Sequence, residues 1–202
     1  MGRRDEKKAL KRKRLEAAGE RAFLQHGYAS ATIDQIAAEA DVARGTFYLY
    51  FKDKDALFSA LIDRFMGPLL TTVKDVRDAL ARCEDTPSTF PIYAAFGLQV
   101  SELLRSHASL VRLYLSESRS PGKGGAIIRK RSVRLERLTT EILEDAVRRG
   151  LLREHDTHVA THAILGAIER IAMQILRGDR TVDGERVPFE IVVLFRQGLA
   201  PL

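Results

Sequence analysis

The sequence predicts an all-α fold, and three observations support this expectation. Apolar residues recur at spacings of three and four along most of the 202-residue chain, whereas few windows alternate with the period of two that marks a strand. Glycine and proline divide the chain into about nine or ten such segments. The composition, 45% hydrophobic and 30% charged, is that of an ordinary globular protein.

The first two predicted helices have clear ends. The first stops at Gly27, a favourable residue for a helix C-terminus. Its apolar stripe contains Leu15, Ala18, Ala22 and Phe23. The second follows Thr32, with Gln35 at the spacing of a capping box. Its apolar positions are Ile33, Ile36, Ala37 and Ala40.

A third short helix is expected to begin near Ala43, and Asp53 can cap a fourth. The apolar stripe of the fourth helix contains Leu57, Phe58, Leu61, Ile62 and Phe65. We expect this helix to break at Gly67-Pro68, because proline lacks a backbone N–H group. Longer helices are expected beyond it, at roughly 69–83, 88–107, 108–118, 125–149, 156–177 and 187–198.

Cysteine content and motifs narrow the class of protein. The one cysteine, Cys83, excludes an internal disulfide and suits a reducing cytosol. The first residues are too charged for a signal peptide, and no apolar run reaches ~18 residues, so we expect a cytoplasmic protein that does not enter a membrane. The sequence contains no hydrolase elbow, dinucleotide fingerprint or metalloprotease motif, and we therefore do not expect an enzyme.

The strongest local signal lies between Thr32 and Phe51. Two helices of about eight or nine residues are too short to be stable alone and need a tight shared core. That core is expected to contain Ile36, Ala37, Val42, Phe47 and Phe51. In the second of these helices, Ala43, Phe47, Tyr50 and Phe51 are expected to point inward, and Arg44 and Tyr48 outward. Such a helix suits a DNA major groove ~12 Å wide, so the sequence predicts a helix-turn-helix.

Over about residues 10–62 the sequence resembles the signature of the tetracycline-repressor (TetR) family. The matching positions are Gly27-Tyr28, Thr32-Ile33, Ile36-Ala37, Ala40, Val42 and the run from Gly45 to Lys54. Asp41 stands where the family most often has glycine, and aspartate also tolerates the left-handed backbone of a tight turn.

The resemblance implies an organisation in two domains. A basic N-terminal arm at 1–9 would precede a three-helix DNA-binding domain at 10–55, with the helix-turn-helix at 32–51. A larger helical domain at 56–202 would bind an effector and form a homodimer. The implied function is that of a sequence-specific transcriptional regulator, a repressor released from double-stranded operator DNA by a small molecule. The alternative is a DNA-bound protein of the same fold whose partner is another protein, without an effector.

The resemblance also implies roles for individual residues. Thr32 looks like a phosphate contact that caps its helix. Arg44 and Thr46 look like groove readers, and Gly45 lets the backbone approach the DNA. Lys54, at the start of the fourth helix, looks like a phosphate clamp.

Three further positions are implied to lie at the DNA. Tyr48 and Tyr50 resemble the aromatic residues of the family that contact the DNA backbone, with Tyr48 the more exposed. Leu49 could touch a thymine methyl group or nothing. The alternative readings are a core aromatic for Tyr50 and a solvated arginine for Arg44.

The net charge of +6 is concentrated at the N-terminus. Residues 1–14 hold eight of the 33 basic and two of the 27 acidic residues, which leaves 25 of each sign in the rest of the chain. The basic residues are Arg3, Arg4, Lys7, Lys8, Lys11, Arg12, Lys13 and Arg14. One hypothesis is a flexible arm at 3–14 that adds phosphate or minor-groove contacts, and the alternative is a solvated tail.

Two predicted helices, near 156–177 and 187–198, carry surplus apolar surface. The first contains Val159, Ala160, Ala163, Ile164, Ala167, Ile168, Ile171, Ala172 and Ile175. The second contains Phe189, Ile191, Val192, Val193, Leu194 and Phe195. Small residues and a wide apolar face are what a symmetric four-helix interface needs, and the resemblance favours this homodimer over a core within one chain.

The helices at 88–107 and 125–149 would then enclose an effector pocket. Candidate lining residues are Tyr93, Phe96, Gln99, Val100, Leu103 and Tyr114. The alternative is that they belong to the core.

Two weaker features carry no function in this interpretation. His158 and His162 share a helical face near His155, but no Cys or nearby Glu completes a metal site. The glycine-rich segment 121–125 lacks the spacing of a phosphate-binding loop. We therefore expect no metal and no cofactor.

Overall fold

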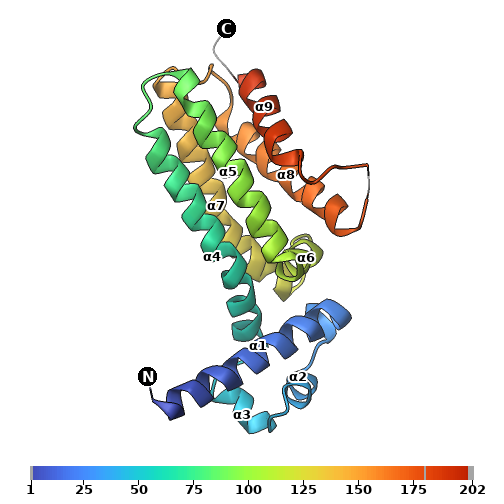
Figure 1. The fold of residues 1–202 in the computed structure, drawn as a ribbon. Helices are drawn as coiled ribbons and strands as arrows, with labels where there is room; N and C mark the ends of the chain where they lie inside the picture. The colour runs from blue at the N-terminus through green and yellow to red at the C-terminus, as the bar shows by residue number, and fades with distance from the viewer. Residues whose placement is uncertain (1, 180, 200–202) are drawn as a thin grey trace. The chain divides into compact units, whose positions relative to one another are not determined.

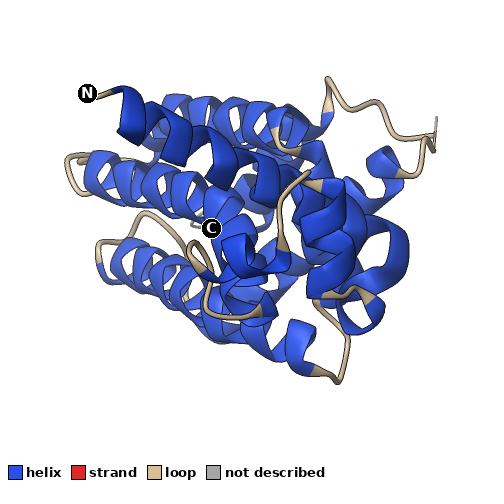
Figure 2. Ribbon diagram, turned by 90° about the horizontal axis from the view of Figure 1, so that it is seen from below, coloured by secondary structure: helices blue, strands red, loops and turns tan. Residues whose placement is uncertain are grey.

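In the computed structural model, which describes residues 2–179 and 181–199, the chain is helical and contains no strand within those residues (Figures 1 and 2). The helices are α1 (Arg3–Ser30), α2 (Ile33–Glu39), α3 (Arg44–Tyr48), α4 (Lys54–Leu80), α5 (Thr86–Ser106), α6 (Ala108–Glu117), α7 (Lys123–Arg148), α8 (Thr157–Leu176) and α9 (Val187–Leu199). The predicted all-α fold is confirmed.

The chain forms two compact units. Unit 1 comprises Met1–Phe65 and Ser109–Lys130, and unit 2 comprises Met66–Ala108 and Arg131–Leu202. Unit 1 is larger than the predicted DNA-binding domain, because α6 and the start of α7 pack with α1. The Tyr28 backbone N–H donates to Glu117 Oε1 at 3.0 Å, and the Ser109 hydroxyl donates to Glu20. These contacts between distant parts of the sequence were not predicted.

The core of unit 1 is an aromatic cluster between α1 and α4. The ring of Phe58 lies 5.3 Å from that of Phe23 and 4.8 Å from that of Tyr28, both in edge-on geometry. Gly19 of α1 lies so close to α4 that a Cβ there would be 2.5 Å from Leu57 Cδ2. The two helices therefore pack at close range.

Two predicted helix ends had different outcomes. Gly27 has φ of 74° and interrupts the helical path of α1, as predicted. The predicted break at Gly67-Pro68 is wrong, because α4 continues to Leu80. Proline costs ~3 kcal/mol inside a helix, but this helix continues its apolar stripe after Pro68 and buries Val73, Val76 and Leu80.

Unit 2 contains α5, α8, α9 and the larger parts of α4 and α7. Asp85 caps α5 by accepting from Ser88 N, and Asp156 caps α8 by accepting from His158 N and Val159 N. The helices α5 and α9 approach closely, since a Cβ on Gly97 would lie 2.9 Å from the Pro188 carbonyl oxygen. Helix caps and close backbone contacts thus stabilise the helices of unit 2.

Candidate nucleic-acid interface

The helices α2 and α3 share the small core that the sequence predicted. Ile36 and Phe47 have no exposed surface, and Ala37 and Phe51 are buried, whereas Val42 is half-buried. Ala43 is exposed and is the N-cap of α3, so the expectation that it points inward is wrong. A cap residue precedes the helix, and the inward face of α3 therefore begins one turn later, at Phe47.

Hydrogen bonds and backbone conformation hold α2 and the turn after it. Gln35 N donates to Thr32 Oγ1 at 3.2 Å, and Thr32 N donates to Gln35 Oε1 at 2.9 Å, which confirms the predicted capping box. Asp41 has φ of 55°, the left-handed conformation that the turn was expected to need. The Val42 N–H then donates to the Ala37 carbonyl at 3.0 Å, and the chain enters α3.

The outer face of α3 exposes the side chains that were predicted to face DNA. Arg44 and Tyr48 are exposed, which confirms their outward orientation. Leu49 is 77% exposed, an unusual position for a large apolar side chain. Gly45 has open space around it, so nothing in the chain blocks a close approach of its backbone. Thr46 and Tyr50 are half-buried. Their DNA contacts stay predictions.

One acidic residue joins this face, and sequence reasoning missed it. Arg44 Nη1 donates to Asp34 Oδ1 at 2.9 Å and to Asp34 Oδ2 at 2.7 Å, across the two helices of the motif. The pKa of Arg44 is raised above its ordinary value, first by a hydrogen bond with the Tyr48 side chain and then by the charge of Asp34. The sequence offered one signal for this contact: an acidic residue in the first turn of α2, next to side chains predicted to contact DNA.

Lys54, the predicted phosphate clamp, holds the end of α1. Its Nζ donates to the carbonyl oxygens of Tyr28, Ala29 and Ala31 at 2.7, 3.0 and 2.9 Å, and lies 4.7 Å from the centre of the Tyr28 ring. Burial lowers the pKa of Lys54. An ammonium group has three donors, and a phosphate contact would therefore replace one of these bonds. The geometry favours a structural role, and the phosphate contact stays a prediction.

The basic segment at 3–14 is the first half of α1, so it is a helix and not the flexible arm of the hypothesis. Residues 3–14 are exposed. The Arg12 guanidinium lies 4.9 Å from the centre of the Phe51 ring and forms an ion pair of 2.9 Å with Glu16. These contacts connect the basic helix to the helix-turn-helix within unit 1.

In unit 2, α8 and α9 leave large apolar side chains exposed. Val159 is 64% exposed, Phe189 55% and Leu194 67%. By length and hydropathy both α4 and α8 could cross a membrane, but only 11% of the most apolar window of α8 is buried, against 39% for α4. These side chains of α8 and α9 therefore do not fill the core of one chain.

The six predicted pocket residues lie in different surroundings, and their contacts with an effector stay predictions. Tyr93 and Phe96 pack against a buried cluster of Val76, Leu80 and Cys83, and Gln99 is exposed. Val100 is buried and Leu103 is half-buried. Tyr114 belongs to unit 1, where its ring lies 5.9 Å from that of Phe65.

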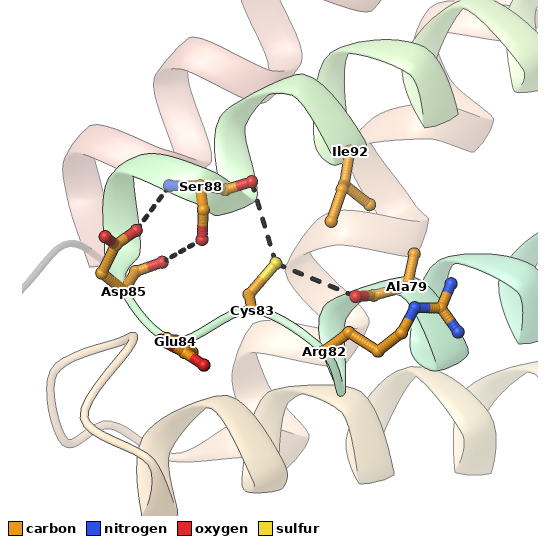
Figure 3. Close-up of a pocket in the computed structure, with 7 residues that line it drawn as sticks. All are labelled: Ala79, Arg82, Cys83, Glu84, Asp85, Ser88 and Ile92. Atoms are coloured by element: carbon orange, nitrogen blue, oxygen red, sulfur yellow. Dashed lines mark hydrogen bonds between the residues drawn. The ribbon is translucent and has the colours of Figure 1, made fainter.

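Unit 2 has a surface pocket of 460 Å³ between the end of α4 and the start of α5 (Figure 3). Cys83 faces it, with Sγ 3.8 Å from the Ala79 carbonyl oxygen and 3.7 Å from that of Ser88. Its lining residues are Ala79, Arg82, Cys83, Glu84, Asp85, Ser88 and Ile92.

Comparisons with known proteins agree with the fold and with the motif. A family model described as bacterial regulatory proteins of the tetR family matches residues 15–61, and one described as a tetracyclin repressor-like C-terminal domain matches residues 94–173. The chain is 30% identical over 111 residues to YerO, an uncharacterized HTH-type transcriptional regulator of Bacillus subtilis. That match covers 55% of this chain and 37% of YerO.

Solved structures extend the similarity to nearly the whole chain. FadR from Bacillus subtilis, in complex with stearoyl-CoA, is 21% identical with a TM-score of 0.71, and 92% of this chain and 97% of FadR are covered. SmeT, the repressor of the Stenotrophomonas maltophilia multidrug efflux pump SmeDEF, is 20% identical with a TM-score of 0.74, and 94% of this chain and 90% of SmeT are covered. At this identity the similarity establishes the fold.

Proposed function

Because the chain belongs to the TetR family of bacterial regulatory proteins, we propose that it regulates transcription by binding operator DNA as a homodimer. The observation that carries this proposal is the geometry of α3. Phe47 is fully buried on one side of this helix, whereas Arg44 and Tyr48 are exposed on the other. A short helix held rigidly in this way presents its N-terminal side chains to the edges of bases.

The side chains of the helix-turn-helix divide between base reading and backbone contact. Arg44 can donate two hydrogen bonds to a guanine, and the exposed methyl groups of Leu49 suit a thymine methyl. Thr46 would also read the groove. Thr32, Tyr48 and Tyr50 would contact phosphates or sugars, and Gly45 would permit the approach of the backbone. The basic half of α1 is a further surface for phosphates, because it is exposed and joined to the motif through Arg12 and Phe51.

The exposed apolar faces of α8 and α9 support a homodimer. Burial of Val159, Phe189 and Leu194 against a second copy removes apolar surface that one chain leaves in water. Two copies related by a two-fold axis would place two α3 helices in successive major grooves, about 34 Å apart or a multiple of that distance.

Selection of bound duplexes from a random DNA library tests this function. We expect a palindromic consensus with half-sites about one helical turn apart, and an affinity that falls with salt at a slope near −0.9 for each phosphate contact. Absence of any preferred duplex at low ionic strength would contradict the proposal. A consensus without two-fold symmetry would contradict the homodimer on DNA.

We further propose repression that a small-molecule effector with an apolar acyl chain relieves. Support comes from the fold neighbours, one of which holds stearoyl-CoA while another represses an efflux pump. Operator binding is measured with and without saturating stearoyl-CoA, with coenzyme A alone as the control. We expect release by the acylated compound, and complete release requires an effector that prefers the non-binding state by ~5.5 kcal/mol. Unchanged operator affinity would contradict this choice of effector.

A further inference from the structure

An exposed ion pair joins α2 to α3. The carboxylate of Asp34, in the first turn of α2, accepts both of its bonds from one nitrogen of Arg44, the first residue of α3. Both side chains are about 60% exposed, at 62% and 60%. The pair therefore lies on the surface and outside the core that Ile36 and Phe47 form.

An acidic side chain at this place is costly on electrostatic grounds. Thr32 and Arg44 lie on the face proposed to meet DNA, and a carboxylate beside them repels phosphates. Exposed ion pairs contribute little to the stability of a fold, so stability alone is a weak reason for the carboxylate. A gain in DNA discrimination would offset the repulsion.

The geometry of the pair leaves part of the guanidinium available for a base. Both bonds to Asp34 come from the Nη1 group, whereas the N–H groups of Nε and Nη2 are not used in this ion pair. A guanine requires two donors, for its O6 and N7 atoms. Tyr48 lies one turn along α3, and its side chain contributes to the raised pKa of Arg44.

From this arrangement we propose that Asp34 is a positioning residue for base recognition, which holds Arg44 in the orientation that reads one base pair of the operator. The inference rests on the proposed DNA-binding function. Asp34 need not touch DNA. Its contribution is that Arg44 loses less conformational freedom on binding the correct base, because the carboxylate has already restricted it.

The inference predicts opposite effects on specific and non-specific binding. Asp34→Asn removes one negative charge from each subunit, so affinity for unrelated duplex rises. Discrimination at the base pair that Arg44 reads falls by roughly 3- to 10-fold, which corresponds to the ordering of one long side chain. A residue that only stabilised α2 would change the melting temperature without changing the preference at one base pair.

Glu39→Gln is the matched control. Glu39 is also on α2, is exposed and pairs with an arginine, but its partner is Arg21 of α1. This variant removes the same charge and should raise affinity for unrelated duplex in the same way. Its discrimination at the Arg44 base pair should equal that of the wild type.

The experiment begins with the preferred duplex from random-library selection. Arg44→Ala identifies the base pair that Arg44 reads, as the one position where preference is lost. Affinities for the preferred duplex and for its variants at that position are then measured for wild type, Asp34→Asn, Glu39→Gln, Arg44→Ala and the Asp34→Asn/Arg44→Ala double variant. Thermal unfolding of each variant checks that it is folded.

The expected result is a lower discrimination ratio in Asp34→Asn alone and no further change when Arg44 is already alanine. An unchanged ratio in Asp34→Asn, with a clear preference in the wild type, would overturn the inference and leave the proposed function intact. Absence of a preferred duplex for the wild type would instead overturn the proposed function itself.

Discussion

The two compact units differ in how they place their apolar side chains. In unit 1, Leu57 and Ile62 are fully buried, and the exposed face of the helix-turn-helix is mainly polar, with Leu49 as its large exposed apolar side chain. In unit 2, Val159 and Leu194 are more than 60% exposed on α8 and α9. The first unit thus completes its core within one chain, while the second keeps apolar surface that a further copy can bury. The difference agrees with the proposals that unit 1 binds DNA and that unit 2 forms the homodimer.

The largest expected effect contrasts two phenylalanines. Phe58 in unit 1 is fully buried against Phe23 and Tyr28, whereas Phe189 in unit 2 is 55% exposed. Phe58→Ala should lower the free energy of unfolding by ~3–5 kcal/mol, because it leaves a cavity in the aromatic cluster. Phe189→Ala should change the free energy of unfolding of the dilute monomer by less than ~1 kcal/mol. Urea titration followed by circular dichroism measures both, and equal losses would refute the contrast between the units.

The next prediction concerns the apolar face itself. The double substitution Val159→Lys/Leu194→Lys places two charges on α8 and α9 and should convert the dimer to folded monomers in sedimentation velocity. Operator affinity should then fall by ~100-fold or more, because the two half-sites are no longer bound by one linked molecule. Val133→Lys, on an exposed position of α7, is the control and should remain dimeric. A stable dimer in the double variant would show that the interface lies elsewhere.

The next prediction asks whether the half-buried cation Lys54 of unit 1 stabilises the fold or binds DNA. Lys54→Met removes three charge-assisted bonds to carbonyl oxygens at the end of α1 and should lower the free energy of unfolding by ~1–3 kcal/mol. The exposed neighbour Lys52 provides the control, since Lys52→Met removes the same charge. A loss of about one from the salt slope in Lys54→Met, with unchanged stability, would instead support the phosphate clamp.

The features that could be predicted from the sequence are those decided locally. Thr32 and Gln35 form a capping box within one helical turn, and Asp41 adopts the left-handed turn between α2 and α3. The outward orientation of Arg44 and Tyr48 follows from helical spacing alone. Each of these properties depends on residues a few positions apart, and sequence patterns predict interactions over that distance well.

The missed features depend on residues that only the fold brings together. Asp34 lies ten positions from Arg44, and Tyr28 lies 89 positions from Glu117, so no spacing rule indicates either pair. The three carbonyl groups around Lys54 belong to an irregular end of α1 that follows the turn at Gly27. Propensity also failed at Pro68, since the apolar stripe around it outweighs the local preference for a break.

The smallest expected effect compares one tyrosine from each unit under alkaline conditions. In unit 2, burial, with a smaller contribution from the charge of Cys83, raises the pKa of Tyr93 from its ordinary value of 10.0 to about 12. In unit 1, burial and the bond to Asp55 raise the pKa of Tyr28 as well. A phenol whose pKa is higher in the folded state contributes stability below pH 10 and loses it as the pH rises through the folded value.

Between pH 10 and pH 11 the wild type should therefore lose ~1 kcal/mol of unfolding free energy through Tyr93, and Tyr93→Phe should lose that much less. At pH 8 the Tyr93→Phe variant should be close to the wild type, because the half-buried ring is kept. Tyr28→Phe should already be less stable at pH 8, since it also removes the hydrogen bond to Asp55. Urea titrations at pH 8, 10 and 11 separate the two cases. Parallel pH curves for wild type and Tyr93→Phe would mean that the Tyr93 hydroxyl is as accessible to water in the folded state as in the unfolded chain, which would contradict the raised pKa.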